Sequence, residues 1–267
     1  MAVPYPQLVL LGDSLLQQSA NVQDGFSFQG ALQNHCIRRL DVVNRGFSGW
    51  NTANVLQYLD QIIPEPNPSS PQMRYLVILL GANDAVIPLA GTMQHVPIEQ
   101  YKENLVKIIK HSHVQNHKPT ILLVTPPPVD ERKHGRLCKQ EGFPATTRTS
   151  ATSASYSEKA REVARENSGV ILVDFWQALM DKAIAMTPAD YTRGGPCLGS
   201  PENGKAGGLD KLLPDGLHMN GDAYRVLYEQ IKQHIGHEWT NQDAVEGDTC
   251  GYLFPLWHEL NAPNLLR

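Results

Sequence analysis

Short apolar runs alternate along the chain with stretches in which apolar residues recur at helical spacing. The runs are nearly continuous and rich in valine, isoleucine and leucine, and they cover residues 8–11, 42–43, 76–80, 121–124 and 170–173. Such runs are typical of strands that a parallel sheet buries on both faces. Helical spacing is found at 30–40, 98–110, 156–167 and 221–235. The alternation predicts one α/β domain over residues 1–267, a three-layer sandwich with about five parallel strands flanked by helices.

Two segments do not fit this alternation. Residues 187–213 are rich in glycine, proline and polar side chains, and they are too long for a plain connection. We interpret them as a loop insertion that forms a flap over a site. Residues 242–267 contain aromatic residues and leucines after the last helix. This aromatic tail is expected to pack on the body of the protein or on a second copy, as in a homodimer.

Composition excludes several classes of function. Hydrophobic residues make up 41% of the 267 positions and charged residues 19%, but no stretch approaches the roughly 18 apolar residues of a membrane span. The net charge is -4, and lysine and arginine are scattered, so we expect no binding to nucleic acid or to a membrane. Four cysteines, at 36, 138, 197 and 250, share no close spacing. They are expected to be reduced thiols in a cytoplasmic protein, without a metal knuckle.

Candidate chemistry gathers at one edge of the predicted sheet. The segments 12–15, 44–49 and 81–84 follow the first three strands directly. Ligands of parallel sheets bind outside the carboxyl ends of the strands, so these three loops should open on a common edge. A fourth segment, 215–218, precedes the last predicted helix.

Ser14 follows a strand and begins a stretch able to form a helical turn, so it can serve as a nucleophile and donate its own N–H to an oxyanion. A helix cap by Asp13 or Ser14 is the alternative. Gly49 can bring a second backbone N–H close to a ligand, although an ordinary turn explains it too. The Asn83 amide can supply a third donor, or it can stabilise its own turn.

Asp215 and His218 are three residues apart, with a glycine between them. This spacing can place the carboxylate against one imidazole nitrogen and leave the other nitrogen free to accept a proton from Ser14. A surface aspartate and histidine beside a turn would have the same pattern. Because the four segments together fill every role of an acyl-transfer site, we favour a catalytic triad of Ser14, Asp215 and His218.

These segments together resemble the GDSL or SGNH hydrolase superfamily, whose naming Ser, Gly, Asn and His are all present. The stretches 45–47, 80–85 and 215–218 are more closely similar to its isoamyl acetate-hydrolysing esterases, and the likeness runs from about residue 8 to 235. The resemblance implies a flavodoxin-like sheet and a lipase-like esterase of broad specificity that needs no metal or cofactor. It also implies that the oxyanion hole consists of the Ser14 and Gly49 N–H groups and the Asn83 amide.

We therefore expect a serine ester hydrolase that cleaves small carboxylic esters, of short-chain acetyl type, through an acyl-enzyme. A deacetylase or acyl hydrolase acting on a carbohydrate or natural-product intermediate is one alternative, and a non-catalytic binding protein is another. Weaker candidates for the substrate pocket are Asp13, Trp50, Val86 and Ile87, with Phe26 and Phe28, although core packing explains these residues equally well. His113 and His117 have the spacing of metal ligands on a helix, but a helix end favours histidines without any metal.

Overall fold

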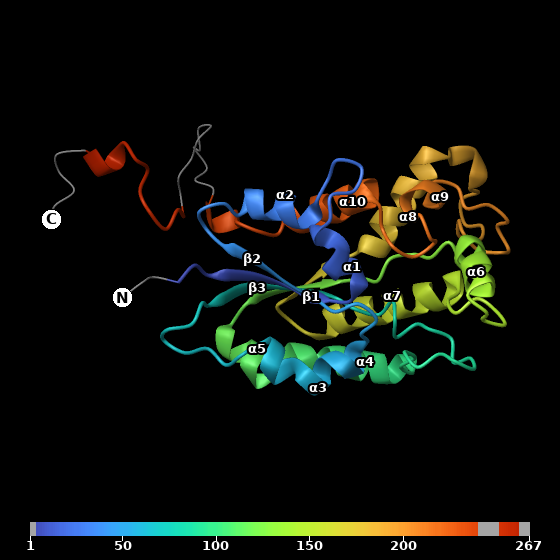
Figure 1. The fold of residues 1–267 in the computed structure, drawn as a ribbon, viewed down its shortest axis with the longest axis horizontal. Helices are drawn as coiled ribbons and strands as arrows, with labels where there is room; N and C mark the ends of the chain where they lie inside the picture. The colour runs from blue at the N-terminus through green and yellow to red at the C-terminus, as the bar shows by residue number, and fades with distance from the viewer. Residues whose placement is uncertain (1–3, 240–250, 262–267) are drawn as a thin grey trace.

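The computed structural model describes residues 4–239 and 251–261. Its centre is a sheet of five parallel strands in the order β2-β1-β3-β4-β5 (Figure 1). The strands are β1 (Gln7–Gly12), β2 (Asp41–Gly46), β3 (Met73–Leu79), β4 (Thr120–Val124) and β5 (Val170–Val173). Each predicted apolar run lies within one of these strands or overlaps it, and the order is that of a flavodoxin-like fold. The predicted fold class is confirmed.

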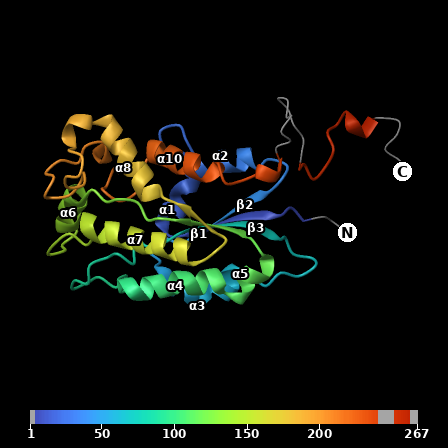
Figure 2. The ribbon, with the colours of Figure 1, turned by 180° about the vertical axis from the view of Figure 1, so that it is seen from behind.

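Helices cover both faces of the sheet and complete three layers (Figures 1 and 2). One face carries α2 (Phe28–His35), α8 (Phe175–Met186) and α10 (Gly221–Lys232), and the other carries α3 (Thr52–Ile62), α4 (Ile98–Lys110), α5 (Ser112–His117) and α7 (Ser150–Glu166). The remaining α-helices of the described residues are α1 (Ser14–Gln17), α6 (Glu131–Gln140) and α9 (Leu209–Leu212).

The core is divided by the sheet into two apolar clusters. Because side chains alternate along a strand, Leu8 and Leu10 belong to the cluster under α2 and α10, whereas Val9 and Leu11 belong to the cluster under α3 and α4. All four side chains are buried. A fully buried leucine contributes about 1.5–3 kcal/mol to folding. The continuous apolar runs therefore follow from a sheet that is covered on both sides.

The strand order places a switch point between β1 and β3. The chain passes from β1 outward to β2 and then returns across β1 to β3, with all three strands parallel. The loops after β1 and β3 therefore leave the sheet in opposite directions, and a crevice forms between them.

Among the predicted helices, α7 and α2 differ most from the sequence prediction. α7 begins at Ser150 instead of residue 156, because the Thr149 hydroxyl caps it by accepting the N–H of Thr152 at 3.0 Å. Ser153 and Ser155 lie inside the helix and do not cap it. α2 ends at His35, before the predicted end at residue 40, and the chain turns at Arg38 with φ of 62°.

The segment 187–213 is packed into the body and is not a flap. Leu198, Leu209 and Leu212 are fully buried in the cluster beneath α8. An ion pair of 2.8 Å joins Lys133 of α6 to Asp210. The prediction of a flap was wrong because the polar and glycine-rich composition of this segment concealed the leucines that anchor it.

The described part of the aromatic tail, residues 251–261, contacts the start of the chain and the end of α2. The Leu253 N–H donates to the Arg38 carbonyl at 3.1 Å, and the rings of Tyr5 and Phe254 lie 6.0 Å apart. The remainder of the predicted tail, 242–250 and 262–267, lies outside the described residues. Within the described ranges, no helix is both long and apolar enough to cross a bilayer.

Candidate active site

Ser14 stands at the first position of α1, directly after β1. The Asp13 carboxylate caps this helix by accepting the N–H of Leu15 at 2.9 Å. The helix cap by Asp13, which the sequence offered as an alternative, is therefore present. It places the Ser14 hydroxyl at the carboxyl edge of the sheet. The two interpretations of this motif are compatible.

A chain of short hydrogen bonds links Ser14, His218 and Asp215. Ser14 Oγ lies 2.9 Å from His218 Nε2, and His218 Nδ1 lies 2.6 Å from Asp215 Oδ2. Because the carboxylate holds the proton on Nδ1, Nε2 is left to accept the hydroxyl proton of Ser14. The geometry is that of a base oriented by a carboxylate and aimed at a hydroxyl.

The segment 215–218 forms its turn through the same carboxylate. Asp215 Oδ1 accepts the N–H groups of Leu217 at 2.9 Å and His218 at 2.7 Å. Gly216 has φ of 85°, and a Cβ there would come within 2.7 Å of the Asp130 carbonyl. A glycine is therefore required between the aspartate and the histidine.

These contacts keep Asp215 ionised. Partial burial alone would raise the pKa of the Asp215 carboxyl, but the hydrogen bonds from the His218 ring and from the two backbone N–H groups lower it to about 2. The carboxylate is thus charged at any pH at which the imidazole could act as a base.

Three N–H groups without a hydrogen-bond acceptor among the described residues border one cavity beside the Ser14 hydroxyl. The backbone N–H groups of Ser14 and Gly49 donate to no other described residue, and the Asn83 amide gives only one of its two protons, to the Trp50 carbonyl at 2.8 Å. Ser14, Gly49 and Asn83 all line one cavity. Gly49 has φ of 82°, a conformation that glycine adopts readily.

A buried network joins the loops that carry two of these donors. Asp84 Oδ1 accepts both the N–H and the hydroxyl of Thr52, and the Asn104 amide donates to the same hydroxyl. The Gln94 amide, from the loop between β3 and α4, donates to the Gly49 carbonyl at 2.8 Å. The loops after β2 and β3 are therefore fixed against each other.

Two aspartates of the motifs are buried below the site. Burial raises the pKa of Asp13 to about 7 and that of Asp84 to about 6. Each has one carboxyl oxygen, Oδ2, without a hydrogen-bond partner in the described structure. Both groups are costly to ionise where they lie.

The cavity has a volume of about 300 Å³. Its wall combines the predicted residues with Ser48 and Leu217 of the same motif segments. Five other lining residues lie outside the motifs: Gln94, His134, Leu137, Glu141 and Arg148. Several of these follow β4, on α6 and on the loop before α7. The rule that located the first three loops also applies to the loop after β4, and this is the signal that could have found them.

The weaker pocket candidates lie elsewhere. None of Asp13, Trp50, Val86 and Ile87 lines the cavity. Asp13 is fully buried beneath Ser14, and Val86 belongs to the core. The Trp50 ring stacks on Phe47, with centroids 4.5 Å apart, and packs against the apolar cluster under α3 and α4. These four residues are close to the motifs in sequence, but their side chains do not point into the cavity.

Phe26 and Phe28 also pack away from the cavity. Phe28 is fully buried, and its ring lies 6.3 Å from that of Tyr224. Phe26 packs edge-on against Tyr228 of the same helix, α10.

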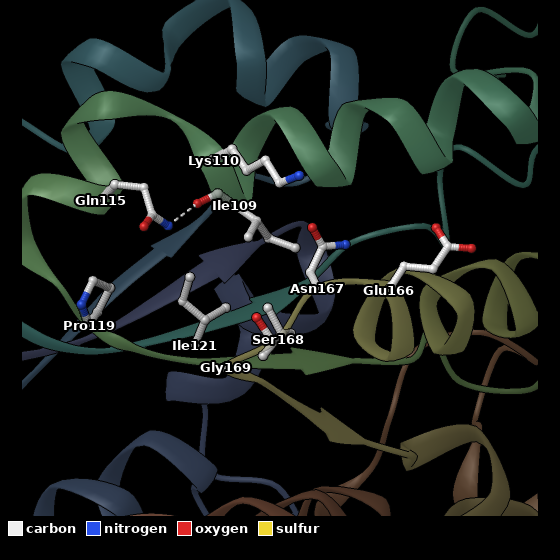
Figure 3. A pocket seen from close by; sticks show the side chains of 10 residues that line it. Ile109, Lys110, Gln115, Pro119, Ile121, Glu166, Asn167, Ser168 and Gly169 are labelled. Atoms are coloured by element: carbon white, nitrogen blue, oxygen red, sulfur yellow. Dashed lines mark hydrogen bonds between the residues drawn. The ribbon is translucent and has the colours of Figure 1, made fainter.

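Another cavity, of about 360 Å³, lies at the opposite end of the strands (Figure 3). Its lining comes from the ends of α4 and α7 and from the starts of β4 and β5, with Lys110, Asn167 and Glu166 among the polar groups. Figure 3 shows no hydroxyl–imidazole pair among its lining residues. The hydrogen-bonded pair of Ser14 and His218 lies instead at the carboxyl edge of the sheet.

The two histidines considered as metal ligands, His113 and His117, contact backbone groups. His117 is buried, with Nδ1 accepting the Met73 N–H at 3.1 Å and Nε2 contacting the Pro64 carbonyl. His113 Nδ1 contacts the Ile63 carbonyl at 2.8 Å. The contacts of both rings therefore hold the loop before β3 in place.

The sequence profile of the GDSL-like lipase/acylhydrolase family matches residues 10–226. A GDSL esterase/lipase of Arabidopsis thaliana is 28% identical over 91% of this chain and 90% of its own length. The human isoamyl acetate-hydrolyzing esterase 1 homolog is 30% identical over 86% of this chain and 81% of its own.

Solved structures share the fold. A lipase/acylhydrolase from Enterococcus faecalis superposes with a TM-score of 0.56 at 22% identity, covering 86% of this chain and 95% of that one. The acetyl xylan esterase AlAXEase gives 0.60 at 16% identity, covering 86% and 99%. With the profile match extending over most of its length, the chain belongs to the GDSL-like lipase/acylhydrolase family and is a carboxylic ester hydrolase.

Proposed function

We propose that the protein is a serine esterase that cleaves small, short-chain acyl esters through a covalent acyl-enzyme. The observation that carries the proposal is the hydrogen-bonded chain from Ser14 through His218 to Asp215, which ends beside three unoccupied N–H donors in one cavity. A nucleophile, a base, an orienting carboxylate and an anion pocket are the parts that acyl transfer requires.

In the first half of the reaction, Ser14 Oγ attacks the ester carbonyl carbon while His218 Nε2 accepts the hydroxyl proton. The carbonyl oxygen becomes an oxyanion that the N–H groups of Ser14, Gly49 and Asn83 stabilise. The C–O bond to the alcohol then breaks, and His218 returns the proton to the leaving alkoxide. In the second half, water attacks the acyl-enzyme with the same histidine as base, and the acid and free Ser14 are released.

Support for a short acyl group comes from relatives and from the cavity. The human relative is named for isoamyl acetate hydrolysis, and several solved structures of this fold are titled acetyl xylan esterases. A cavity of about 300 Å³ is at the small end of ligand sites.

A second candidate, a deacetylase of a carbohydrate or natural product, is favoured by the wall of the cavity. Ser48, Gln94 and Glu141 place a hydroxyl, an amide and a carboxylate around the site. Such groups can hydrogen-bond to a hydroxylated alcohol, whereas an alkyl alcohol offers them no partner.

The proposal is tested by the hydrolysis of nitrophenyl esters from acetyl to decanoyl. We expect the highest kcat/KM at acetyl and a Ser14→Ala variant about a million-fold slower in turnover. Activity absent from the whole series, or equal in the variant, would overturn the serine mechanism. Comparing kcat/KM for isoamyl acetate and for an acetylated sugar then separates the two substrate classes.

A further inference from the structure

Arg148 is a buried cation in the wall of the cavity. It comes from the loop after α6, immediately before the Thr149 cap of α7, and its residue is only 8% exposed. No carboxylate lies within ion-pair distance of its guanidinium among the described residues, although several other arginines of the chain form such pairs. Burial lowers the pKa of the Arg148 guanidinium.

A buried charge without an ionic partner lowers the stability of a fold. Its desolvation is recovered only in part by hydrogen bonds to neutral acceptors. The stability of the fold therefore does not explain an arginine at this position.

The hydrogen bonds of Arg148 lead to the oxyanion donor. Its Nε donates to the Ala82 carbonyl at 2.8 Å, and its Nη2 donates to Asn83 Oδ1 at 2.7 Å. The other end of that amide, Nδ2, donates to the Trp50 carbonyl at 2.8 Å. The Asn83 amide is thus held between a cation on its oxygen and a carbonyl on its nitrogen.

These two contacts determine which way the amide faces. In a flipped amide, the NH₂ group would meet the guanidinium and the oxygen would meet the Trp50 carbonyl, so that two donors and two acceptors would oppose each other. The observed orientation leaves the second N–H of Asn83 for the cavity. A charge-assisted bond to the amide oxygen also polarises the amide and strengthens its N–H as a donor.

Nearby groups act on this positive charge: Asp13, Cys138 and Asp215 raise the pKa of the Arg148 guanidinium, against the lowering by burial. The His134 ring lies with Nε2 3.4 Å from Arg148 Nη1. Burial, and then the charge of Arg148, lower the pKa of His134 to about 4, so this imidazole is neutral under working conditions. Burial raises the pKa of Asp13 to about 7, so this acid is partly protonated near neutrality, whereas Asp215 is ionised.

We propose that Arg148 is a positioning residue for catalysis, which fixes the orientation of the Asn83 amide and strengthens it as an oxyanion donor. The inference rests on the proposed function, because it assigns Arg148 a part in the same acyl transfer. It extends the site to a residue outside the four motif segments.

The test combines kinetics with a double-mutant cycle. Arg148→Met keeps the length and apolar stem of the side chain, Arg148→Lys restores a charge, and Arg165→Met removes an exposed arginine of α7 as a control. We expect Arg148→Met to lower kcat for nitrophenyl acetate by about tenfold to a hundredfold, less than the loss of a whole donor, with KM little changed. Arg148→Lys should recover part of this loss, and Arg165→Met should match the wild type.

The cycle with Asn83→Ala shows whether Arg148 acts through the amide. In the Asn83→Ala background, we expect Arg148→Met to lower kcat by less than about threefold, because the group on which it acts is gone. Equal losses in both backgrounds, or a change confined to KM, would overturn the proposal. Urea unfolding of each variant separates these effects from a loss of fold.

A second measurement is independent of turnover. The side-chain NH₂ signals of Asn83, assigned by their absence from Asn83→Ala, should shift in Arg148→Met and stay in place in Arg165→Met. Unchanged signals in Arg148→Met would refute the positioning role even if the enzyme were inactive on every ester tried. An inactive wild type with shifted signals would instead contradict the proposed function alone.

Discussion

At the scale of single residues, the site is organised by side chains that each satisfy several backbone groups. Asp215 holds two N–H groups with one oxygen and the His218 ring with the other. Asn83 is bonded at both ends of its amide. Groups restrained in this way need little rearrangement when charge develops on the substrate.

The first prediction at this scale concerns Asn83. Asn83→Ala removes one of three proposed oxyanion donors, so kcat for nitrophenyl acetate should fall by about a hundredfold to a thousandfold. Steady-state kinetics measure the effect, and an unchanged urea midpoint shows that the fold is intact. A loss of less than about fivefold would remove Asn83 from the oxyanion hole.

The second concerns Asp13 and pH. Its folded-state pKa of about 7 is above the unfolded value of 3.8, so the carboxyl stabilises the fold fully only below pH ~4 and loses that contribution as the pH rises through about 7. Asp13→Asn keeps an oxygen for the Leu15 cap and cannot ionise. We expect the variant to gain on the order of 2 kcal/mol relative to the wild type between pH ~5 and ~8.

Urea unfolding at pH ~5 and at pH ~8 measures the gain in the free energy of unfolding. Asp190→Asn removes a partly exposed carboxylate that pairs with Lys205 and serves as a control for the loss of one negative charge. A stability difference between wild type and Asp13→Asn that does not grow with pH would show that Asp13 ionises normally in its buried position.

At the scale of elements, the sequence predicted strands better than helices. The five apolar runs located every strand because a sheet covered on both faces leaves no polar position to confuse the pattern. α6 was not predicted because it buries only Cys138 and shows no apolar stripe. The start of α7 was missed because its first turn consists of serine, alanine and threonine.

The residues of the candidate site also differ in how well the sequence predicted them. The motif residues could be placed because each directly follows a strand or forms one tight turn. His134 and Arg148 reach the cavity from α6 and the loop after it, whose course depends on tertiary contacts that no local pattern encodes. Short sequence motifs therefore located the reacting groups and missed the wall around them.

The prediction at this scale concerns the cap of α7, which also anchors Arg148. Thr149→Ala removes the acceptor for the Thr152 N–H and should lower the free energy of unfolding by about 1 kcal/mol. Thr149→Ser keeps the hydroxyl and should differ little from the wild type. Urea unfolding measures both, and equal stability of Thr149→Ala and the wild type would show that the first turn of α7 does not depend on this cap.

At the scale of the whole molecule, the residues of the proposed site lie at one edge of the sheet. Ser14, Gly49 and Asn83 follow the carboxyl ends of three adjacent strands around the switch point. Residues 251–261 of the aromatic tail lie at the other edge, since Arg38, which they contact, precedes the start of β2. Figure 1 shows the start of β1 and residues 251–261 on the side away from α6.

This separation predicts that the tail is dispensable for chemistry. A chain that ends at residue 250 loses the contacts of Leu253 and Phe254 with Arg38 but keeps every residue of the cavity wall. We expect its kcat for nitrophenyl acetate to stay within about twofold of the full chain, with a lower urea midpoint. A strong loss of kcat at an unchanged midpoint would place the tail in the reaction.

The adjacency of the Tyr5 and Phe254 rings, 6.0 Å apart, has a practical consequence. Both ends of the described chain leave the molecule on the side opposite the nucleophile. A resin or an affinity handle attached close to Tyr5 or Phe254 would therefore leave the cavity that contains Ser14 open to the bulk solution and would not obstruct the entry of substrate.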